Sequence, residues 1–468
     1  MHIVELQQEN LPLTISDLAM DGRGVMELLA IEPGPLVGEI LEKLLARVIE
    51  NPELNNAADL QQLVINERSS RMAEVRPMRA LRYNTNKIEM EKVVAPPYDV
   101  ISPEQQEEYY KASPYNIIRL ELGKGEAGDN ETNNRYTRAK AALDAWQKEE
   151  VLSLDTKPSF YIYEQEFQVE GKTYQRRGIF ARLKLVDFSE GIVLPHEETL
   201  SGPKADRNQL LEATRTNLSP IFGLFADEKR QIGSIMDQVC QGKPDLDFKG
   251  FDQIGERLWR VSDQDLCQEI SDLFAPEKIY IADGHHRYET ALAFSKRHPE
   301  ADAIMIVLVP LNNPGLVCLP THRMLIDVDL SGLLEKLQPK FEIQSFAPEK
   351  EAQETIVKAL EERKHAFGLI LPDGYHLLTL KEEAALKPEK LGHSPAYCQL
   401  DVTILHKLIL EDELGIGKEE LRAQSKVRYT RSSQEAILAV KNGEVLASFL
   451  MGSVDVNEVK LVAEAGEK

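Results

Sequence analysis

The chain has 468 residues, 42% of them hydrophobic and 28% charged, so it can bury sizeable cores, and a length of this size suggests about three domains. Its 77 acidic residues against 55 Lys and Arg give a net charge of −22, which excludes broad binding to DNA or to an anionic membrane, because both would repel it. The four cysteines form no C-x-x-C pair, MHIVELQQEN lacks the regions of a signal peptide, and no apolar run nears the roughly 18 residues of a spanning helix. We therefore expect a cytoplasmic protein in a reducing compartment.

The first 67 residues differ in composition from the rest, with acidic residues far outnumbering basic ones. Apolar residues recur at helical spacing from Leu36 to Val48, after the start signal Pro33-Gly34-Pro35, and predict one helix there. A shorter helix is predicted over Ala57 to Val64. Residues 1–67 are thus expected to form a small all-α module.

A connector with five arginines follows this module, in the segment RSSRMAEVRPMRALR. The run is typical of a solvated linker that enters a strand, and it is also compatible with an anion-binding edge. Its basic residues are Arg68, Arg71, Arg76, Arg79 and Arg82.

Short strands and helices alternate in the remainder of the chain, which predicts an α+β protein. Two alternating runs joined by Glu170-Gly171 indicate a β-hairpin, and KIYIA and AIMIVLVP are expected to be buried strands. Helical spacing predicts further helices over residues 131–150, 206–216, 286–296, 353–364 and 402–412.

The segment KIYIADGHHRYETALAFSKRH carries the strongest local signal for a binding site. A strand ends at Asp283, Gly284 permits a tight turn, and a helix begins near His286. The N–H groups at a helix start attract anions, and a glycine lets a phosphate approach closely. Arg287 adds a guanidinium suited to phosphate oxygens, and Asp283 is a candidate Mg²⁺ ligand. The alternative is that Asp283 merely caps the helix and that His285 and His286 are surface residues.

A second candidate is the loop PHEET and the helix that follows it. Glu197 and Glu198 beside His196 could supply a general base, and Lys204 and Arg207 could bind phosphate. The alternative is an acidic loop that is only solvated.

Other site types have weaker support from the sequence. Two further turn-like residues, Asp99 in APPYDVIS and His322 in LPTHRM, could line the same pocket or be structural. The chain has no Walker or Rossmann glycine motif and no H-E-x-x-H spacing, so a metal site built from both clusters is disfavoured. That metal site would draw on His196, Glu197, Glu198, His285 and His286.

From Arg76 to its end, the chain resembles a bacterial and archaeal family filed as domain of unknown function one thousand and fifteen. The most distinctive landmarks are PHEETLSGPKADRNQLLEATRTNLSPIFGLF and IADGHHRYETALAF. Further ones are RPMRALRYN, VVAPPYDVIS, SPYNIIRLELG, GLVCLPTHR and LDVTILHKLIL.

That family is similar in turn to the ParB/sulfiredoxin-like superfamily, which includes free serine kinases. The resemblance implies a ParB/sulfiredoxin-like mixed α/β core with additional β-rich and α/β lobes. Pro220-Ile221 would match the superfamily's Pro-Ile strand, and Gly284 to Arg287 its Gly-x-x-Arg phosphate turn. Sulfiredoxin chemistry is excluded, because its turn needs a cysteine where His285 stands. The expected divisions are a helical module over 1–67, an α/β lobe with the hairpin over 68–189, the nucleotide-site region over 190–330, and a C-terminal α/β lobe over 331–468.

A second resemblance concerns the helical module. The segment LPLTISDLAMDGRGVMELLAIEPGPLVGEILEKLLARVIENPELN is similar to the C-terminal tail domain of bacterial CCA-adding tRNA nucleotidyltransferases. The acidic composition favours a scaffold or interaction element over a tRNA contact.

Together, these features predict a nucleotide-dependent phosphotransferase that acts on a small hydroxyl metabolite, with free L-serine as the first candidate. ATP or ADP would donate the phosphate and Asp283 would place Mg²⁺. Glu198 or Glu197 would act as base, while His285 and His286 stabilise developing charge. The alternatives are a phosphoserine-type phosphatase that uses the same site, or a non-catalytic nucleotide- or tRNA-associated binding protein.

Overall fold

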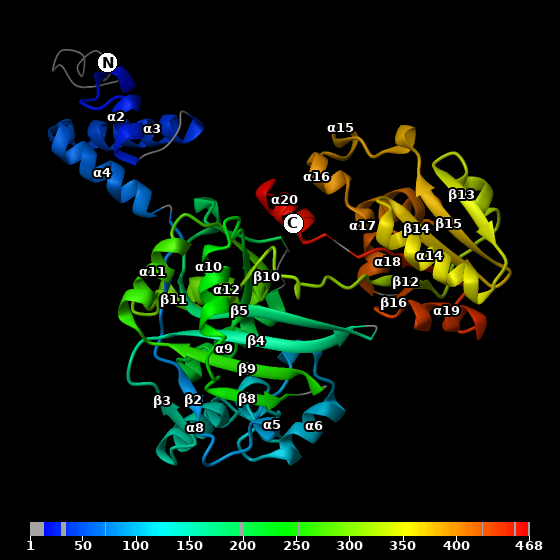
Figure 1. Ribbon diagram of the computed structural model, residues 1–468, viewed down its shortest axis with the longest axis horizontal. Coiled ribbons are helices and arrows are strands. Elements are labelled where there is room, and N and C mark those ends of the chain that lie inside the picture. The colour runs from blue at the N-terminus through cyan, green and yellow to red at the C-terminus, as the bar shows by residue number, and fades with distance from the viewer. Residues whose placement is uncertain are drawn as a thin grey trace.

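The computed structural model describes residues 14–29, 34–70, 72–169, 171–196, 201–250, 253–423, 425–453 and 455–466. The protein is of the α+β class, as the alternation of strands and helices predicts. Figure 1 shows a group of helices at the N-terminal end, a central body built on a large twisted sheet, and a second sheet with its own helices toward the C-terminus.

The N-terminal helices pack on one another around a small core of their own. Helices α2 (Gly22–Leu29), α3 (Pro35–Glu50) and α4 (Ala57–Ser70) form this group. Ile40 and Leu44 are fully buried on one face of α3, as the helical spacing predicts. Both predicted helices are confirmed, and α4 extends further than the sequence analysis expected.

The central body is a nine-stranded mixed sheet whose strands come from both sides of residue 189, where the sequence analysis placed a boundary. The predicted hairpin is present as β4 and β5, with Val169 opposite Lys172. The order is β6-β10-β7-β11-β5-β4-β9-β8, with β1 on β5. The strands are β1 (Val75–Arg76), β4 (Phe160–Val169), β5 (Lys172–Lys184), β6 (Val193–Leu194), β7 (Ile221–Phe225), β8 (Leu246–Lys249), β9 (Gly255–Val261), β10 (Ile279–Asp283) and β11 (Ala303–Pro310).

Helices cover the central sheet and its edge. Those over the central core are α10 (Gln231–Val239), α11 (Gln264–Phe274) and α12 (His285–Ser295). A neighbouring core contains Trp146, Leu143 and Leu210, beside the two-stranded sheet of β2 (Leu81–Tyr83) and β3 (Leu152–Leu154). The helices around it are α5 (Met90–Val93), α6 (Pro103–Ala112), α7 (Ile118–Glu121), α8 (Arg135–Lys148) and α9 (Ser201–Thr214).

The C-terminal part is built on a six-stranded sheet in the order β13-β15-β14-β17-β12-β16, with an apolar core on each face. Its strands are β12 (His322–Leu325), β13 (Phe341–Phe346), β14 (Ala366–Leu371), β15 (Gly374–Leu380), β16 (Val427–Thr430) and β17 (Ala447–Met451). Its helices are α13 (Leu333–Leu337), α14 (Lys350–Glu362), α15 (Pro388–Leu391), α16 (Pro395–Cys398), α17 (Asp401–Ile404), the π-helix η7 (Leu405–Glu411), α18 (Lys418–Ala423) and α19 (Ser433–Lys441).

The last helix, α20 (Val456–Glu464), returns from the second sheet to the first, where Figure 1 shows it in red between the two bodies. Ala463 packs with Leu224 and Val309 of the central sheet. The hydroxyl of Tyr280 donates to Glu464 at 2.6 Å. The C-terminal helix, which follows the last strand of the six-stranded sheet, therefore packs on the central sheet.

Two expectations about turn and linker residues are corrected in part. His322 is not a surface turn residue, because it lies buried in β12 and its Nδ1 accepts from the backbone N–H of Met451 at 3.1 Å. In the arginine-rich connector, Arg76 pairs with Asp302 at 2.8 Å and Arg82 with Asp155 at 2.8 Å. These two guanidiniums are taken by carboxylates and about a quarter exposed, so the connector enters strand β1 as expected but does not offer them to an outside anion.

No helix within the described ranges is both long and apolar enough to cross a membrane.

Candidate functional site

Two parallel strands bring the two candidate loops to one edge of the central sheet. Strand β6 pairs parallel with β10, with Val193 opposite Ile279 and Leu194 opposite Tyr280. Because parallel strands point the same way, the PHEET loop that follows β6 emerges beside the turn that follows β10. Strand β7 runs antiparallel to β10, so its first residues lie at the same edge. Three segments that are distant in sequence thus meet there.

The turn after β10 depends on Gly284, which has a φ of 93° and precedes the first residue of α12. A β-carbon at this position would lie 2.8 Å from a methyl group of Ile221 and 3.1 Å from Nε of Arg287. Only glycine therefore fits both the backbone conformation and the space. The turn presents the first N–H groups of an eleven-residue helix, where the helix dipole favours a negative charge.

Arg287 is held across the mouth of the turn by three acceptors. One terminal nitrogen, Nη1, donates to the carbonyl of Pro220 at 2.5 Å and to the hydroxyl of Ser219 at 3.1 Å. The other, Nη2, pairs with Asp283 at 2.5 Å. The Arg287 side chain is 13% exposed and that of Asp283 is 56% exposed. The guanidinium is therefore fixed in place, while its carboxylate partner faces solvent and can be displaced or can change partners.

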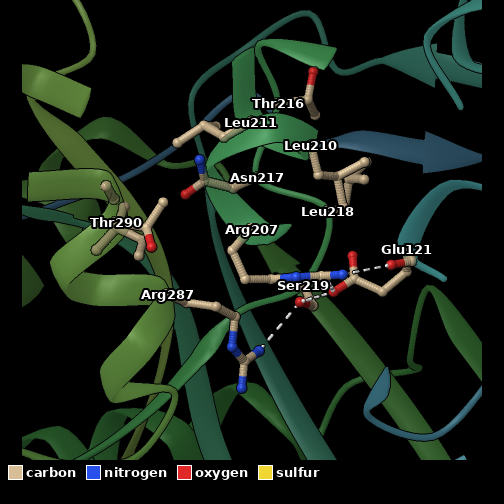
Figure 2. A pocket seen from close by; sticks show the side chains of 12 residues that line it. Glu121, Arg207, Leu210, Leu211, Thr216, Asn217, Leu218, Ser219, Arg287 and Thr290 are labelled. Carbon is tan, nitrogen blue, oxygen red and sulfur yellow. Dashed lines mark hydrogen bonds and ion pairs between the residues drawn. The ribbon is translucent and has the colours of Figure 1, made fainter. Parts of the chain in front are cut away.

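A buried polar chain continues from Arg287 into the protein, as Figure 2 shows. The Ser219 hydroxyl donates to Oε1 of Glu121 at 2.8 Å, and the same oxygen accepts from Nη1 of Arg207 at 3.0 Å. The Arg207 guanidinium lies 3.9 Å from the centre of the Tyr98 ring. Glu121 and Arg207 thereby support Ser219, which in turn supports the guanidinium at the turn.

The structure places Arg207 differently from the phosphate contact that the sequence analysis expected. Its side chain is only 7% exposed and is paired with both Glu121 and Asp206. Burial raises the pKa of Asp206, but Arg207 and its other partners outweigh burial and lower it overall. Because these carboxylates occupy the guanidinium, we assign Arg207 a positioning role.

His196, the second residue of the PHEET segment, contacts the turn directly. The backbone N–H of His196 donates to Nε2 of His285 at 3.3 Å, and the two rings meet edge to face with centres 4.7 Å apart. His285 is 2% exposed, whereas His286 beside it is partly exposed. Glu197 and Glu198 lie outside the described residues, so their predicted role remains a prediction.

The helix that carries the turn is anchored on its inner face. Tyr288 is fully buried, stacks on Phe188 with ring centres 5.1 Å apart, and donates its hydroxyl to the carbonyl of Val186 at 2.8 Å. Burial raises the pKa of Tyr288 to about 12. Lys204 of α9 forms an ion pair with Glu289 of α12 and remains partly exposed close to the turn.

Among the described residues at the turn, Asp283 is the carboxylate that could bind Mg²⁺. Within the described ranges, no group of three or more His, Cys, Asp or Glu side chains could hold a metal ion. The metal site that would combine the two histidines with the two glutamates includes residues outside those ranges. Asp283 fits the usual Mg²⁺ pattern, in which one or two carboxylates, waters and substrate phosphates share the ion.

A shallow, partly open pocket with an internal volume of about 50 Å³ adjoins Arg287 between α9 and α12 (Figure 2). One wall is apolar and the other holds the polar chain described above. The Thr290 hydroxyl oxygen is buried at the pocket without a hydrogen-bond partner among the described residues. The lining residues are Glu121, Arg207, Leu210, Leu211, Thr216, Asn217, Leu218, Ser219, Arg287, Thr290, Ala291 and Ile304.

Sequence reasoning missed Tyr98, Glu121 and Ser219. All three lie in segments quoted above as family landmarks, namely VVAPPYDVIS, SPYNIIRLELG and TNLSPIF. No local pattern marks them, because each acts through a partner distant in sequence. Asp99, which the sequence analysis named as a possible lining residue, is exposed next to Tyr98.

Comparison with solved structures finds several partial resemblances. A conserved hypothetical protein from Pyrococcus furiosus is 14% identical, with 62% of this chain and 86% of that chain covered and a TM-score of 0.28. A free serine kinase in complex with AMP is 15% identical, with 62% and 83% covered and a TM-score of 0.26. A glutamate-to-alanine mutant of a free serine kinase in complex with ADP is 13% identical, with the same coverage and a TM-score of 0.28. Superpositions at these scores are too loose for an activity to be inferred from them.

No curated protein matches the chain. The model of one protein family does match it, over residues 75–403, which span the central sheet, the turn after β10 and much of the second sheet. The chain therefore belongs to the family described as "Protein of unknown function (DUF1015)".

Proposed function

We propose that the protein is a nucleotide-dependent phosphotransferase that acts on the hydroxyl group of a small metabolite, with free L-serine as the first substrate to test. The observation that carries this proposal is the meeting of the PHEET loop with the Gly284–Arg287 turn at one sheet edge, through the contact between His196 and His285. An anion-binding turn and an acidic loop are the two parts that such a transfer requires.

The turn would bind the phosphates. The N–H groups at the start of α12 and the guanidinium of Arg287 both favour a phosphate oxygen, and Gly284 leaves room for it. Because Arg287 is held by backbone and hydroxyl acceptors, its position is set before the ligand arrives. Preorganised charge of this kind lowers the cost of binding and of reaction.

The acidic loop would act on the substrate. Glu198 or Glu197, which follow His196 in the sequence, would accept the hydroxyl proton as the oxygen attacks the phosphorus and the nucleotide leaves. His285 and His286 stand at the helix start, where they would stabilise charge on the transferred group. Mg²⁺ held by Asp283 would supply further charge neutralisation. The partly open pocket beside Arg287 would receive a small substituent of the ligand.

The proposal is tested by following phosphate transfer with ³¹P NMR. Protein and Mg²⁺ are incubated with L-serine plus ATP, with L-serine plus ADP, and with phosphoserine alone. The proposal predicts nucleotide-dependent formation of a phosphate ester. Release of inorganic phosphate from phosphoserine without nucleotide would instead identify a phosphatase that uses the same residues.

Variants separate binding from turnover. Glu198→Gln and Glu197→Gln should leave nucleotide binding intact, and at least one of them should abolish transfer. Arg287→Ala should remove both. Arg297→Ala is the matched control, because Arg297 lies just past the end of α12 and pairs with Glu212 on the surface. If both glutamine variants keep wild-type turnover, the assignment of the base is refuted.

A further inference from the structure

Arg323, a buried arginine in the C-terminal sheet, forms no ion pair with a carboxylate of the described residues, whereas the buried Arg207 does. Arg323, in β12, is 7% exposed. One terminal nitrogen donates to the carbonyl of Thr321 and the other contacts Nε2 of His406 at 3.2 Å. Its Nε atom is buried without a hydrogen-bond partner.

The other buried arginine of the described residues, Arg207, provides the contrast. In α9, Arg207 is buried to the same extent and pairs with Glu121 and Asp206. Across the described part of the chain, no carboxylate forms an ion pair with the Arg323 guanidinium. A buried charge without a partner of opposite sign is costly and is rarely kept for stability alone.

The groups around Arg323 are neutral hydrogen-bonding and aromatic side chains. Tyr429 lies opposite it on β16, with its ring centre 5.7 Å from the guanidinium carbon. Burial and the nearby Arg323 lower the pKa of His406 to about 4, so this imidazole is neutral near pH 7. His322, the neighbouring residue of β12, is also buried, and burial followed by Arg323 lowers its pKa to about 4. None of these groups balances the positive charge.

The cluster reaches the surface of the protein through its neighbours. Thr321, His406 and Tyr429 are each partly exposed, so a small ligand can approach the guanidinium past them. His406 is presented by η7, a helix with π-type hydrogen bonding. Helical segments of this type are rare in proteins, and those that occur are often found at functional sites. The two segments that meet here, LPTHR and LDVTILHKLIL, are both landmarks that the phosphotransferase proposal does not use.

We propose that Arg323, His406, Thr321 and Tyr429 form a second anion-binding site, which takes a small ligand carrying a carboxylate or phosphate group. Nε, which has no partner among the described residues, donates to one oxygen of the anion and the second N–H of Nη2 donates to the other, while the neutral imidazole and phenol set the orientation of the ligand. The site lies on the six-stranded sheet, apart from the turn that would bind nucleotide phosphates.

The test measures binding of inorganic phosphate and of succinate to the full chain by thermal shift and by isothermal titration calorimetry. The two probes distinguish the two sources of the oxyanion. We expect one of them to raise the melting temperature of the wild type saturably, because a ligand that binds only the folded state stabilises it. In the Arg287→Ala background, which removes phosphate binding at the central turn, Arg323→Met should lose that shift, with apparent affinity at least tenfold weaker.

Three further variants make the result specific. Arg287→Ala, which removes the phosphate contact of the central site, should keep the shift. Arg428→Met should also keep it, because Arg428 is exposed on β16 and its replacement changes the net charge equally. Arg323→Lys keeps the charge without the planar fork and should bind at least tenfold more weakly.

The ligand-free proteins provide a second readout. If Arg323 is kept for a ligand, Arg323→Met without anion should melt at the wild-type temperature or above it, because an unbalanced buried charge has been removed. The proposal is overturned if neither probe stabilises the wild type at millimolar concentration. It is equally overturned if, in the Arg287→Ala background, Arg323→Met or Arg323→Lys binds the probe as tightly as the chain that keeps Arg323.

Discussion

Replacement of Gly284 by alanine tests whether the turn after β10 is built around the absence of a side chain. The residue has a φ of 93°, so alanine there pays the strain of a backbone region that residues with a β-carbon rarely adopt. The new methyl group would also lie 2.8 Å from Ile221 and 3.1 Å from Arg287. Both neighbours must move to relieve the overlap, and one of them is the proposed phosphate ligand.

The expected magnitude follows from these two contributions. Backbone strain of this kind costs about 1–2 kcal/mol, and an overpacked methyl group costs about 1–3 kcal/mol more. The chain provides a matched control in Gly191, which has a φ of 68° and where an added β-carbon would meet nothing within 4 Å. Gly191→Ala should therefore show only the strain contribution, and Gly284→Ala should be less stable than it by about 2 kcal/mol.

The assay combines urea denaturation with titration of ATP. Gly284→Ala should bind the nucleotide at least tenfold more weakly than the wild type, because the displaced guanidinium no longer faces the phosphates, whereas Gly191→Ala should bind normally. Equal stability of the two variants would refute the packing argument. Wild-type affinity in Gly284→Ala would show that phosphates do not bind at the turn.

Three other changes have defined outcomes. Glu121→Gln removes the charge opposite buried Arg207 and weakens two charge-assisted hydrogen bonds, so the free energy of unfolding should fall by about 2 kcal/mol, as measured by urea denaturation. Burial and Arg323 lower the pKa values of His322 and His406 to about 4 in the folded protein, below that of a histidine in the unfolded chain. The melting temperature should therefore fall as the pH drops from about 6.5 to 4, and His406→Gln should make this dependence on pH weaker. The core of residues 1–67 contains no residue of the central sheet, so removal of this module should leave nucleotide affinity unchanged. If the intact chain binds tRNA in a salt-dependent way and the shortened chain does not, a tRNA-associated role is supported.

Local patterns in the sequence predict an element well where one continuous segment forms it. The strand, glycine and helix around Gly284 follow each other without interruption, so periodicity and the turn residue predict β10 and α12 to within a residue or two. The hairpin of β4 and β5 is predicted for the same reason. Its strands are adjacent, and their alternation of apolar residues is long.

Contacts between segments that are distant in sequence could not be predicted from these local patterns. Strand β6 has only two residues, and nothing in Val193-Leu194 indicates that it pairs with β10, although that pairing is what joins the acidic loop to the turn. The role of Glu121 depends on two distant partners and leaves no periodic signal. His322 was misplaced because the Pro and Thr before it are typical of a turn, whereas the short strand that begins there is buried on both faces.

The central claim is that the Gly284–Arg287 turn binds the phosphates of a nucleotide. Isothermal titration calorimetry of ATP and ADP in the presence of Mg²⁺, on the wild type, Arg287→Ala and Arg297→Ala, tests it most directly. Loss of a charge-assisted guanidinium–phosphate contact is worth about 1.5–3 kcal/mol, so Arg287→Ala should bind at least tenfold more weakly while Arg297→Ala binds as the wild type does. Equal affinity of all three proteins, or no binding by any of them, would contradict the account.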